Sequence, residues 1–297
     1  MKKTLKDWFI AMRPWSFPAS SMPVVATLCY LYWAGHTVDW VGGVWALVAI
    51  VAFHAAGNTW SDYFDFKHRV DASDTYGVKT LTSGQFSPKE IFCLSLGLLA
   101  VALLLGVGLL CYTGWPLLYV GLGGVVCTLL YPALKYRALG DVVIFFAYAL
   151  LPVSGTSYVA TGVFHPMALW LVLPIGLITV AILHANNTRD VYTDERAGIH
   201  TLPMRLSLAQ AVIIYKVEVL FPFLWIAVCV ACGVFPLWSL LVLLAFKPAW
   251  VNAQLMSDFV KKGRESIASL DERTAKLQLM FSVLLALSFG LAVWFSL

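Results

Sequence analysis

Nine apolar stretches, each about as long as a membrane-spanning helix, run through this sequence. They lie near 17–35, 41–60, 91–112, 115–132, 141–162, 167–186, 208–232, 236–256 and 277–296. About 20 helical residues cross the hydrocarbon core of a bilayer. Of the 297 residues, 60% are hydrophobic and only 12% are charged. This composition has more apolar surface than the core of a soluble protein can bury. The sequence therefore predicts an all-α membrane protein with about nine transmembrane helices.

The connections between these stretches carry lysine and arginine only alternately. The connections near 36–40, 113–114, 163–166 and 233–235 contain neither residue. By the positive-inside rule, the N-terminus and the charged loops face the cytoplasm and the C-terminus lies outside. We therefore expect an integral protein of a bacterial inner (cytoplasmic) membrane, in contact with lipid. No basic stripe or recognition module suggests a nucleic-acid partner.

Few charged residues fall outside the loops. Residues 2–13 carry apolar side chains at helical spacing among lysines, which is typical of an amphipathic helix lying in the membrane interface. Away from the ends of the apolar stretches, the charged residues are Lys216, Glu218 and Lys247. For these we expect either snorkelling towards the interface or a Lys247–Glu218 pair near the cytoplasmic end.

Two acidic motifs follow apolar stretches on the predicted cytoplasmic side. Their members are Asn58, Asp62 and Asp65 in the first and Asn187, Asp190 and Asp194 in the second. At about 100° per residue, each set falls within about 60° on one face of a helix. Acids at a membrane mouth gain nothing from topology rules and indicate a functional site. Carboxylates and an amide suit Mg²⁺, which takes one or two carboxylates and completes its shell with water and phosphate oxygens.

The two acidic faces predict a shared site for Mg²⁺ and a diphosphate, in which Asp62, Asp65, Asp190 and Asp194 are catalytic through the metal. Basic residues close to the motifs in sequence are candidate diphosphate ligands: Arg69, Lys79, Lys135 and Arg189. Arginine binds phosphate bidentately and lysine binds it as a point charge. Weaker candidates for substrate contact, each equally suited to a loop or interface role, are Asp71, Tyr131 and His200.

The two halves of the chain, about 17–162 and 167–297, have a related organisation. Each contains an apolar stretch, an Asn/Asp motif and then Gly-x-x-Thr-Leu, at 77–81 and 198–202. The pattern indicates a single domain over 1–297 that arose by internal duplication.

At these residues the chain resembles the UbiA superfamily of intramembrane aromatic prenyltransferases. The most specific piece is Asn186-Asn187-x-Arg189-Asp190-x-x-x-Asp194-x-x-x-Gly198-x-x-Thr201-Leu202. Further matching segments are Arg13-Pro14, Asp62-Tyr63-Phe64-Asp65, Ser83-Gly84, Tyr131-Pro132 and Leu139-Gly140-Asp141. Within the superfamily the chain is most similar to the 1,4-dihydroxy-2-naphthoate polyprenyltransferases of menaquinone biosynthesis.

The resemblance implies a helical bundle around a central cavity, with cytoplasmic loops as its cap. It implies that Asn58 and the four aspartates hold Mg²⁺ and the diphosphate of a polyprenyl diphosphate. It also implies that Lys79, Lys135 and Arg189 bind diphosphate oxygens and that Asn187 supports the second metal face beside the diphosphate. Prenyl transfer to the naphthoate would release CO₂ and diphosphate and give a demethylmenaquinone. Aromatic residues that are candidates to line the cavity and face the allylic cation are Tyr63, Phe64, Tyr131, Tyr136, Phe145, Phe146 and Tyr148.

Two alternatives remain open at this stage. The chain departs from the naphthoate branch at Ser61, Lys79, Leu81 and His200, which leaves room for another aromatic acceptor such as a 4-hydroxybenzoate or a homogentisate. The second alternative is a secondary transporter built from repeats. A transporter usually has ionisable groups near the middle of the membrane, whereas here the acids gather on one side.

Overall fold

The computed structural model describes residues 3–70, 76 and 80–296. In that part of the chain all regular secondary structure is helical, apart from an isolated bridge between Arg137 and His200. In chain order the elements are α1 (Leu5–Ala11), η1 (Pro14–Ser16), α2 (Pro18–Trp33), α3 (Trp40–Lys67), α4 (Pro88–Thr113), α5 (Leu117–Lys135), α6 (Gly140–Phe145), η2 (Phe146–Leu150), α7 (Leu151–Thr161), η3 (Pro166–Leu171), α8 (Val172–Arg189), α9 (Val191–Arg196), η4 (Leu202–Arg205), α10 (Leu208–Ala231), η5 (Leu237–Ala245), α11 (Phe246–Lys262), η6 (Arg264–Ile267) and α12 (Leu270–Ser296).

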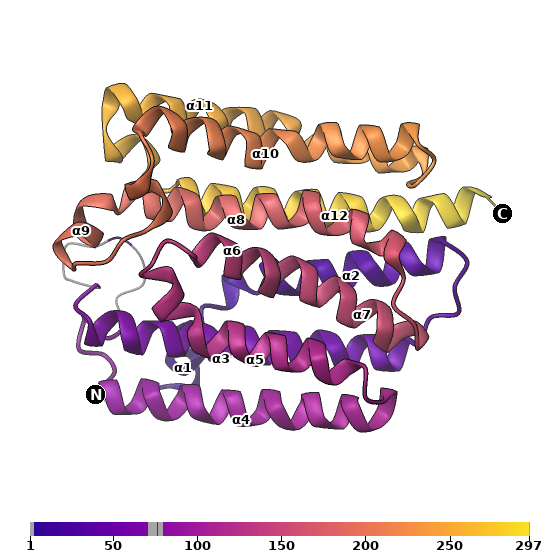
Figure 1. Cartoon of the computed structure of the whole chain (residues 1–297), viewed down its shortest axis with the longest axis horizontal. Coiled ribbons are helices and arrows are strands. Elements are labelled where there is room, and N and C mark those ends of the chain that lie inside the picture. Colours follow the sequence, from indigo (N-terminus) through magenta and orange to yellow (C-terminus); the bar gives the residue numbers. More distant parts are fainter. Residues whose placement is uncertain (1–2, 71–75, 77–79, 297) are drawn as a thin grey trace.

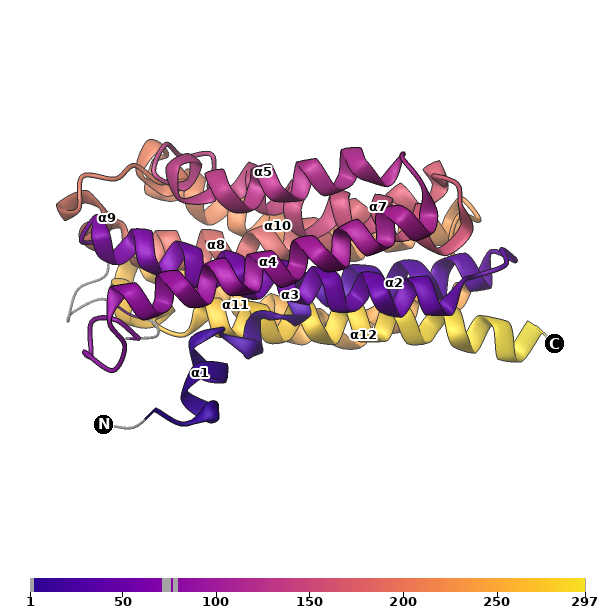
Figure 2. The same ribbon diagram turned by 90° about the horizontal axis from the view of Figure 1, so that it is seen from below.

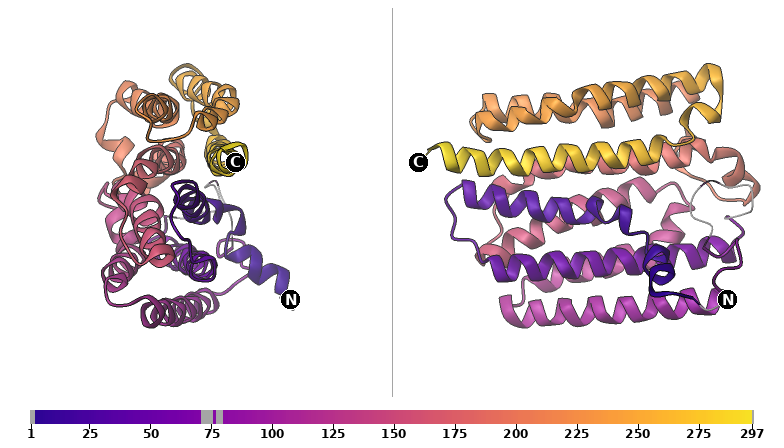
Figure 3. Two further views of the ribbon diagram at one scale, coloured as in Figure 1. Left: turned by 90° about the vertical axis from the view of Figure 1, so that its right-hand side faces the viewer. Right: turned by 180° about the vertical axis from the view of Figure 1, so that it is seen from behind.

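The long helices lie side by side along one axis and form a single bundle (Figure 1; Figure 3). The N-terminal segment and α9 lie at one end, and the C-terminus lies at the other end. The short helix α1 projects from the side of the bundle (Figure 2). The predicted all-α architecture is confirmed, and the two termini lie at opposite ends as the predicted topology requires.

Eight helical segments among the described residues are long and apolar enough to cross a membrane. They coincide with the second to ninth predicted stretches. The first predicted stretch corresponds to α2, which has only 16 residues and would span about 24 Å at 1.5 Å per residue. It is shorter than the predicted 17–35 because the helix begins at Pro18 and already ends at Trp33.

The interior of the bundle is built around α12, which packs against both α2 and α8. Phe281 and Phe289 of α12 and Tyr215 of α10 are fully buried there. Other large apolar side chains are exposed on the outside, such as Leu104, which is 73% exposed. An apolar exterior is expected of a protein whose solvent is lipid, since no water drives these side chains inward.

Polar residues at helix starts explain several of the element boundaries. The carboxylate of Asp39 accepts hydrogen bonds from the N–H groups of Val41 and Gly42, both at 3.0 Å, and so caps α3. The amphipathic segment predicted over 2–13 contains α1, which begins with a capping box of Thr4 and Asp7. The backbone N–H and hydroxyl of Thr4 lower the pKa of Asp7 below its usual value.

One pairing predicted within the spans is wrong. Glu218 lies 3.3 Å from Nδ1 of His184 on α8, and it does not pair with Lys247. Lys247 is exposed on the outside of the bundle, as the snorkelling alternative requires. Glu218 instead faces inward, is 5% exposed and has its contact with His184 inside the bundle.

Candidate active site

The first acidic motif occupies the last turns of α3. Asp62 and Asp65 are 3% and 6% exposed. Asn58 lies one turn earlier on the same face, and its amide donates hydrogen bonds to the carbonyl of Met12 and to Oγ of Ser16, both at 3.0 Å. The three side chains share one face of a continuous helix as predicted, and Asn58 anchors the segment that leads into α2.

Asp65 is the centre of a network of hydrogen bonds. Its carboxylate accepts hydrogen bonds from Nζ of Lys135 at 3.1 Å, from the hydroxyl of Tyr136 at 2.7 Å and from the hydroxyl of Ser61 at 3.2 Å. Lys135 and Tyr136 come from the end of α5, which brings a positive charge to the first motif. The predicted position of Lys135 beside the aspartates is therefore observed.

Arg13 is a site residue that the motif analysis missed. It has a φ of 56°, in the left-handed region, and this turn directs the chain from α1 into η1. Its guanidinium forms an ion pair with the carboxylate of Asp62. The two residues are 49 positions apart in sequence. The Arg13-Pro14 dipeptide indicated only a resemblance to the family. It did not predict the contact with Asp62, because no local pattern shows which carboxylate a distant arginine contacts.

The second acidic motif is divided between two helices, contrary to the continuous helix assumed from the sequence. The helix α8 ends at Arg189, Asp190 adopts φ −96° and ψ 8° as its C-cap, and α9 begins at Val191. Asp194 lies on α9 and is 5% exposed. The break changes the direction of the chain, so the angular relation between Asn187, Asp190 and Asp194 is set by this turn.

Arg189 holds this turn in place. Its Nε and Nη2 donate to the two carboxylate oxygens of Asp190 at 2.9 and 2.8 Å. Its remaining N–H groups donate to Asn186, to the carbonyl of Ala268 and to Asp271. Guanidinium has five N–H donors, and these contacts use all of them. The predicted diphosphate contact of Arg189 would require it to release one of these partners, so the geometry favours a role in positioning Asp190.

The two motifs meet electrostatically at Lys135. Its ammonium interacts with the carboxylate of Asp65 and also with that of Asp194. Of the two adjacent asparagines, Asn186 lines the cavity beside this network. Asn187, the predicted residue, is 2% exposed, and its Oδ1 has no hydrogen-bond partner among the described residues. Lys135 thus links the acidic residues of the two halves of the chain.

The remaining candidates lie in different positions around this network. Tyr131 lines the cavity. Arg69 is exposed just after the end of α3. His200 has an exposed side chain, while its backbone N–H donates to the carbonyl of Tyr136 at 3.1 Å and so supports a partner of Asp65. Asp71 and Lys79 lie outside the described residues.

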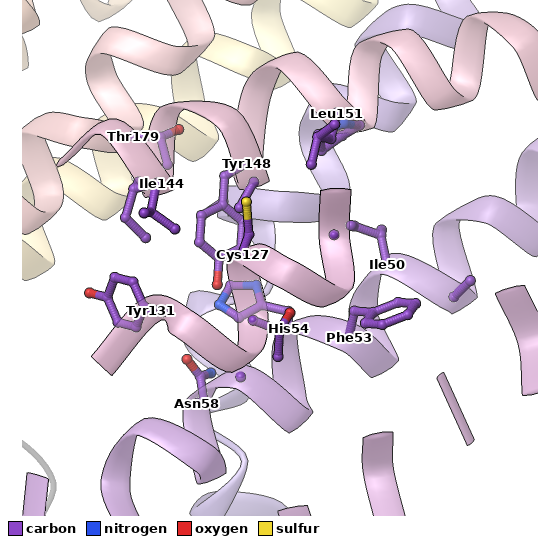
Figure 4. Close-up of a pocket in the computed structure, with 18 of the residues that line it drawn as sticks. Ile50, Phe53, His54, Asn58, Cys127, Tyr131, Ile144, Tyr148, Leu151 and Thr179 are labelled. Atoms are coloured by element: carbon purple, nitrogen blue, oxygen red, sulfur yellow. The ribbon is translucent and has the colours of Figure 1, made fainter. Parts of the chain in front are cut away.

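A cavity of about 520 Å³ extends from the acidic network into the bundle. Its polar end includes Asp65, Lys135 and Asn58, and beyond it the walls are mainly apolar side chains of α3, α4, α5 and α7. Figure 4 shows His54, Asn58, Tyr131 and Tyr148 gathered in one part of the cavity. Of the seven aromatic residues predicted to line it, Tyr131 and Tyr148 do so.

Tyr148 reaches the cavity from an irregular stretch of helix. The segment η2 is a single π-helical stretch between α6 and α7, and Pro152 follows it in the first turn of α7. Proline lacks an N–H and disturbs the preceding turn, and such π-bulges occur often at functional sites. His54, which contacts Tyr148, is a second cavity residue that the motif analysis missed. Its spacing of eight residues before Asp62 on α3 was the available signal.

The donor chemistry of the acidic network fits Mg²⁺. Asp65 lines the cavity, and Asp62 lies one turn away on the same helix. Each carboxylate is paired with a cation that a divalent metal can replace. Among the described residues no group of three or more His, Cys, Asp or Glu side chains is arranged to hold a metal ion alone. Mg²⁺ is usually bound by one or two carboxylates together with substrate phosphates.

Solved structures show where this fold occurs. A UbiA homolog from Aeropyrum pernix K1 covers 96% of this chain and 98% of its own, with a TM-score of 0.64 and 15% identity. A UbiA homolog from Archaeoglobus fulgidus, bound to GPP and Mg²⁺, covers 94% of this chain and 99% of its own, with a TM-score of 0.60 and 13% identity. Both similarities concern the fold.

Sequence comparison shows the family. A protein named UbiA prenyltransferase domain-containing protein 1 from Gallus gallus is 32% identical over 283 residues, which cover 93% of this chain and 82% of the relative. The Homo sapiens protein of the same name is 30% identical over 93% of this chain and 81% of its own length. The model of the UbiA prenyltransferase family matches residues 21–270. The chain is therefore an enzyme that belongs to the UbiA prenyltransferase family.

Proposed function

We propose that this enzyme transfers the prenyl group of a polyprenyl diphosphate to 1,4-dihydroxy-2-naphthoate in a Mg²⁺-dependent reaction, giving CO₂, diphosphate and a demethylmenaquinol, the reduced form from which a separate oxidation gives the demethylmenaquinone. The observation that carries the proposal is the polarity of the cavity. Asp65 and Lys135 stand at one end of the same cavity whose other walls are apolar. An amphiphile with a charged diphosphate head and a hydrocarbon tail fits that division.

In the proposed complex, Asp62, Asp65, Asp190 and Asp194 hold Mg²⁺, supported by Asn58. The bound metal supplies charge neutralisation for the departing diphosphate. The Archaeoglobus fulgidus relative bound to GPP and Mg²⁺ supports this assignment. The ion pairs Arg13–Asp62 and Lys135–Asp65 place two cations next to the metal ligands, so each cation can pass from its carboxylate to a diphosphate oxygen.

The apolar part of the cavity receives the prenyl tail. Its walls include Phe53 on α3, Leu103 on α4 and Leu122 on α5. Leu122 is 53% exposed, although it belongs to this wall. An apolar enclosure keeps water away from the allylic carbon when the C1–O bond breaks and its electron pair leaves with the diphosphate.

Aromatic and hydroxyl-bearing side chains near the acidic network suit a hydroxylated ring. Tyr131, Tyr148 and His54 line this part of the cavity with Asn58. The aromatic faces favour positive charge developing on the prenyl carbon. The choice of the naphthoate among aromatic acceptors rests on the sequence resemblance. A 4-hydroxybenzoate or a homogentisate is the alternative acceptor, whereas membership of a prenyltransferase family disfavours the transporter.

The membrane placement completes the proposal. The cytoplasmic position of the acidic end follows from the positive-inside rule. Location in a bacterial inner membrane remains a prediction, and the similar relatives described above come from animals.

The test is a prenyl-transfer assay on the purified chain in detergent. An all-trans polyprenyl diphosphate and 1,4-dihydroxy-2-naphthoate are supplied with Mg²⁺ or with EDTA, and products are detected by mass spectrometry. A prenylated, decarboxylated product that forms only with Mg²⁺ is expected. If the chain binds the diphosphate in a Mg²⁺-dependent manner but forms no product, the naphthoate is not the acceptor, and the prenyl diphosphate site still stands. If the chain neither forms product nor binds the diphosphate, the proposed function is refuted.

Variants connect the assay to the site. Asp62→Asn and Asp190→Asn should each lower turnover by at least about 10³-fold, in the range of a lost electrostatic catalytic group. Lys261→Ala, at the exposed end of α11, is the matched charge control and should retain normal turnover. Near-normal activity of Asp190→Asn would show that the second motif does not hold the metal.

A further inference from the structure

A titratable side chain on the cavity wall has no role in the function proposed so far. His54 is 5% exposed and lines the cavity together with Asn58 and Asp65. On α3 it lies four residues before Asn58 and eight before Asp62, which is about 12 Å along the helix axis. A diphosphate held at Asp62 would extend its prenyl carbon along this wall, so the aromatic ring that attacks that carbon would lie beside His54.

Both ring nitrogens of His54 contact serine hydroxyls. Nδ1 lies 2.8 Å from Oγ of Ser20, and Nε2 lies 3.2 Å from Oγ of Ser16. Each serine hydroxyl also lies within hydrogen-bond distance of a backbone carbonyl. Ser16 donates to the carbonyl of Arg13 at 2.8 Å, and Ser20 donates to that of Phe17 at 3.1 Å.

Neutral imidazole has a single N–H, so only one ring nitrogen of His54 can donate. In the tautomer with its proton on Nδ1, the N–H donates to Ser20, and Nε2 carries a lone pair beside the hydroxyl of Ser16. In that tautomer the single proton of Ser16 is shared between Nε2 and the carbonyl of Arg13.

The ring of His54 is held in orientation by its neighbours. Tyr148 packs against it with ring centroids 4.6 Å apart and an interplanar angle of 49°, and Phe17 packs edge-on at 5.6 Å (Figure 4 shows Tyr148 above His54). Ser16 lines the cavity as well, and it also accepts the amide of Asn58 at 3.0 Å. The nitrogen that can accept a proton is thus fixed beside the cavity and connected to the first acidic motif.

We propose that His54 is the catalytic base of the transfer, accepting at Nε2 the proton of the acceptor hydroxyl adjacent to the attacked carbon. The proposal rests on the proposed function and specifies the acceptor as a phenol. The O–H bond breaks and its proton goes to Nε2. The oxygen electron pair enters the ring, the ring carbon forms a bond to prenyl C1, and the C1–O electron pair leaves with the diphosphate.

The proton is returned when the ring becomes aromatic again. With the naphthoate, attack occurs at the carbon that bears the carboxylate and leaves a carbonyl where the hydroxyl was. The bond to the carboxylate then breaks, CO₂ leaves, and the electron pair of that bond restores the aromatic ring. The oxygen takes its proton back from the His54 imidazolium. No oxidant, reductant or external base is consumed.

The experiment compares His54→Gln with wild type in the full chain, with two acceptors. One is 1,4-dihydroxy-2-naphthoate. The other is an analogue whose electron-withdrawing substituent leaves the hydroxyl ionised at the assay pH. With the first acceptor we expect a 10²- to 10⁴-fold loss of kcat, the usual contribution of a general base. With the second we expect a loss below threefold, since no proton has to be removed. The KM for the prenyl diphosphate should change by less than twofold.

His165→Gln is the matched control. His165 lies in the connection before α8, outside the residues that line the cavity, with Nε2 2.9 Å from Oγ1 of Thr161, and its substitution should leave both rates unchanged. Equal losses of His54→Gln with the two acceptors, or no loss with either, would refute the proposal.

Ser20→Ala is the second variant and is used if His54→Gln does not fold. It removes the oxygen that accepts Nδ1–H, and we expect about a tenfold loss that again disappears with the ionised acceptor. Equal losses of Ser20→Ala with both acceptors would also refute a role for His54 in proton transfer. If wild type forms no product with any aromatic acceptor, the proposed function itself fails, and the role of His54 fails with it.

Discussion

Substitution of Asp65 by asparagine tests the network that joins the two acidic motifs. Asparagine keeps the size of the side chain but removes the charge that Lys135 contacts at 3.1 Å, and its amide nitrogen cannot accept from Tyr136 or Ser61. The Lys135 side chain is only 12% exposed, so its charge loses its closest partner in surroundings of low dielectric constant. Removing one partner of a buried ion pair costs about 3–5 kcal/mol.

Lys135 retains the electrostatic attraction of Asp194, which offsets part of the loss. We therefore expect the lower end of the range, about 3 kcal/mol of unfolding free energy. Thermal unfolding in detergent should show a decrease in melting temperature of roughly 5–10 °C. Mg²⁺-dependent prenyl transfer should decrease by at least about 10²-fold, because a metal ligand is lost.

The double variant Asp65→Asn/Lys135→Met separates the two effects. Methionine removes the unpaired charge and keeps an unbranched apolar stem, so it should recover most of the lost melting temperature and none of the activity. A melting temperature of Asp65→Asn equal to that of wild type would refute the argument. Strictly additive destabilisation in the double variant would do so as well, because coupled residues must show an interaction energy.

Three further substitutions test other parts of the structure. Arg13→Met should raise the KM for prenyl diphosphate about tenfold, or 1.4 kcal/mol, in steady-state assays, and an unchanged KM would exclude a diphosphate contact. Gly176→Ala places a Cβ 2.6 Å from the ring of Phe145, and this overpacking should lower the free energy of unfolding by about 1–3 kcal/mol. Unchanged stability would mean that the ring moves freely. Arg264→Ala removes a cation–π contact 5.4 Å from the Tyr76 ring centroid and should alter turnover less than fivefold, and a larger loss would indicate a role at the site.

Local patterns in the sequence predict much of the fold. Apolar length, helical period and the alternation of charged loops determine which segments become helices and which ends lie together, because backbone groups in lipid must be satisfied within each helix. Asp62 and Asp65 were identified for the same reason. Both lie on one uninterrupted helix, where sequence spacing translates directly into a shared face.

The same reasoning was less successful where the helix did not continue. The prediction for the second motif assumed one helix through Asp194. Instead, Asp190 is the C-cap of α8, and both of its carboxylate oxygens accept hydrogen bonds from Arg189. The spacing of Glu218 and Lys247 was compatible with an ion pair, yet His184 is the residue that Glu218 meets. Helical period cannot show which of several neighbouring helices a polar side chain faces.

Apolar length and residue spacing are enough to predict an all-helical membrane protein with two acidic motifs on the same side. The residues that complete the site depend on how the helices pack. Arg13 meets Asp62 across 49 positions and Lys135 meets Asp65 across 70. Such contacts depend on how whole helices pack. The helices pack through apolar surfaces, so the sequence periodicity does not show which polar residues the packing brings together.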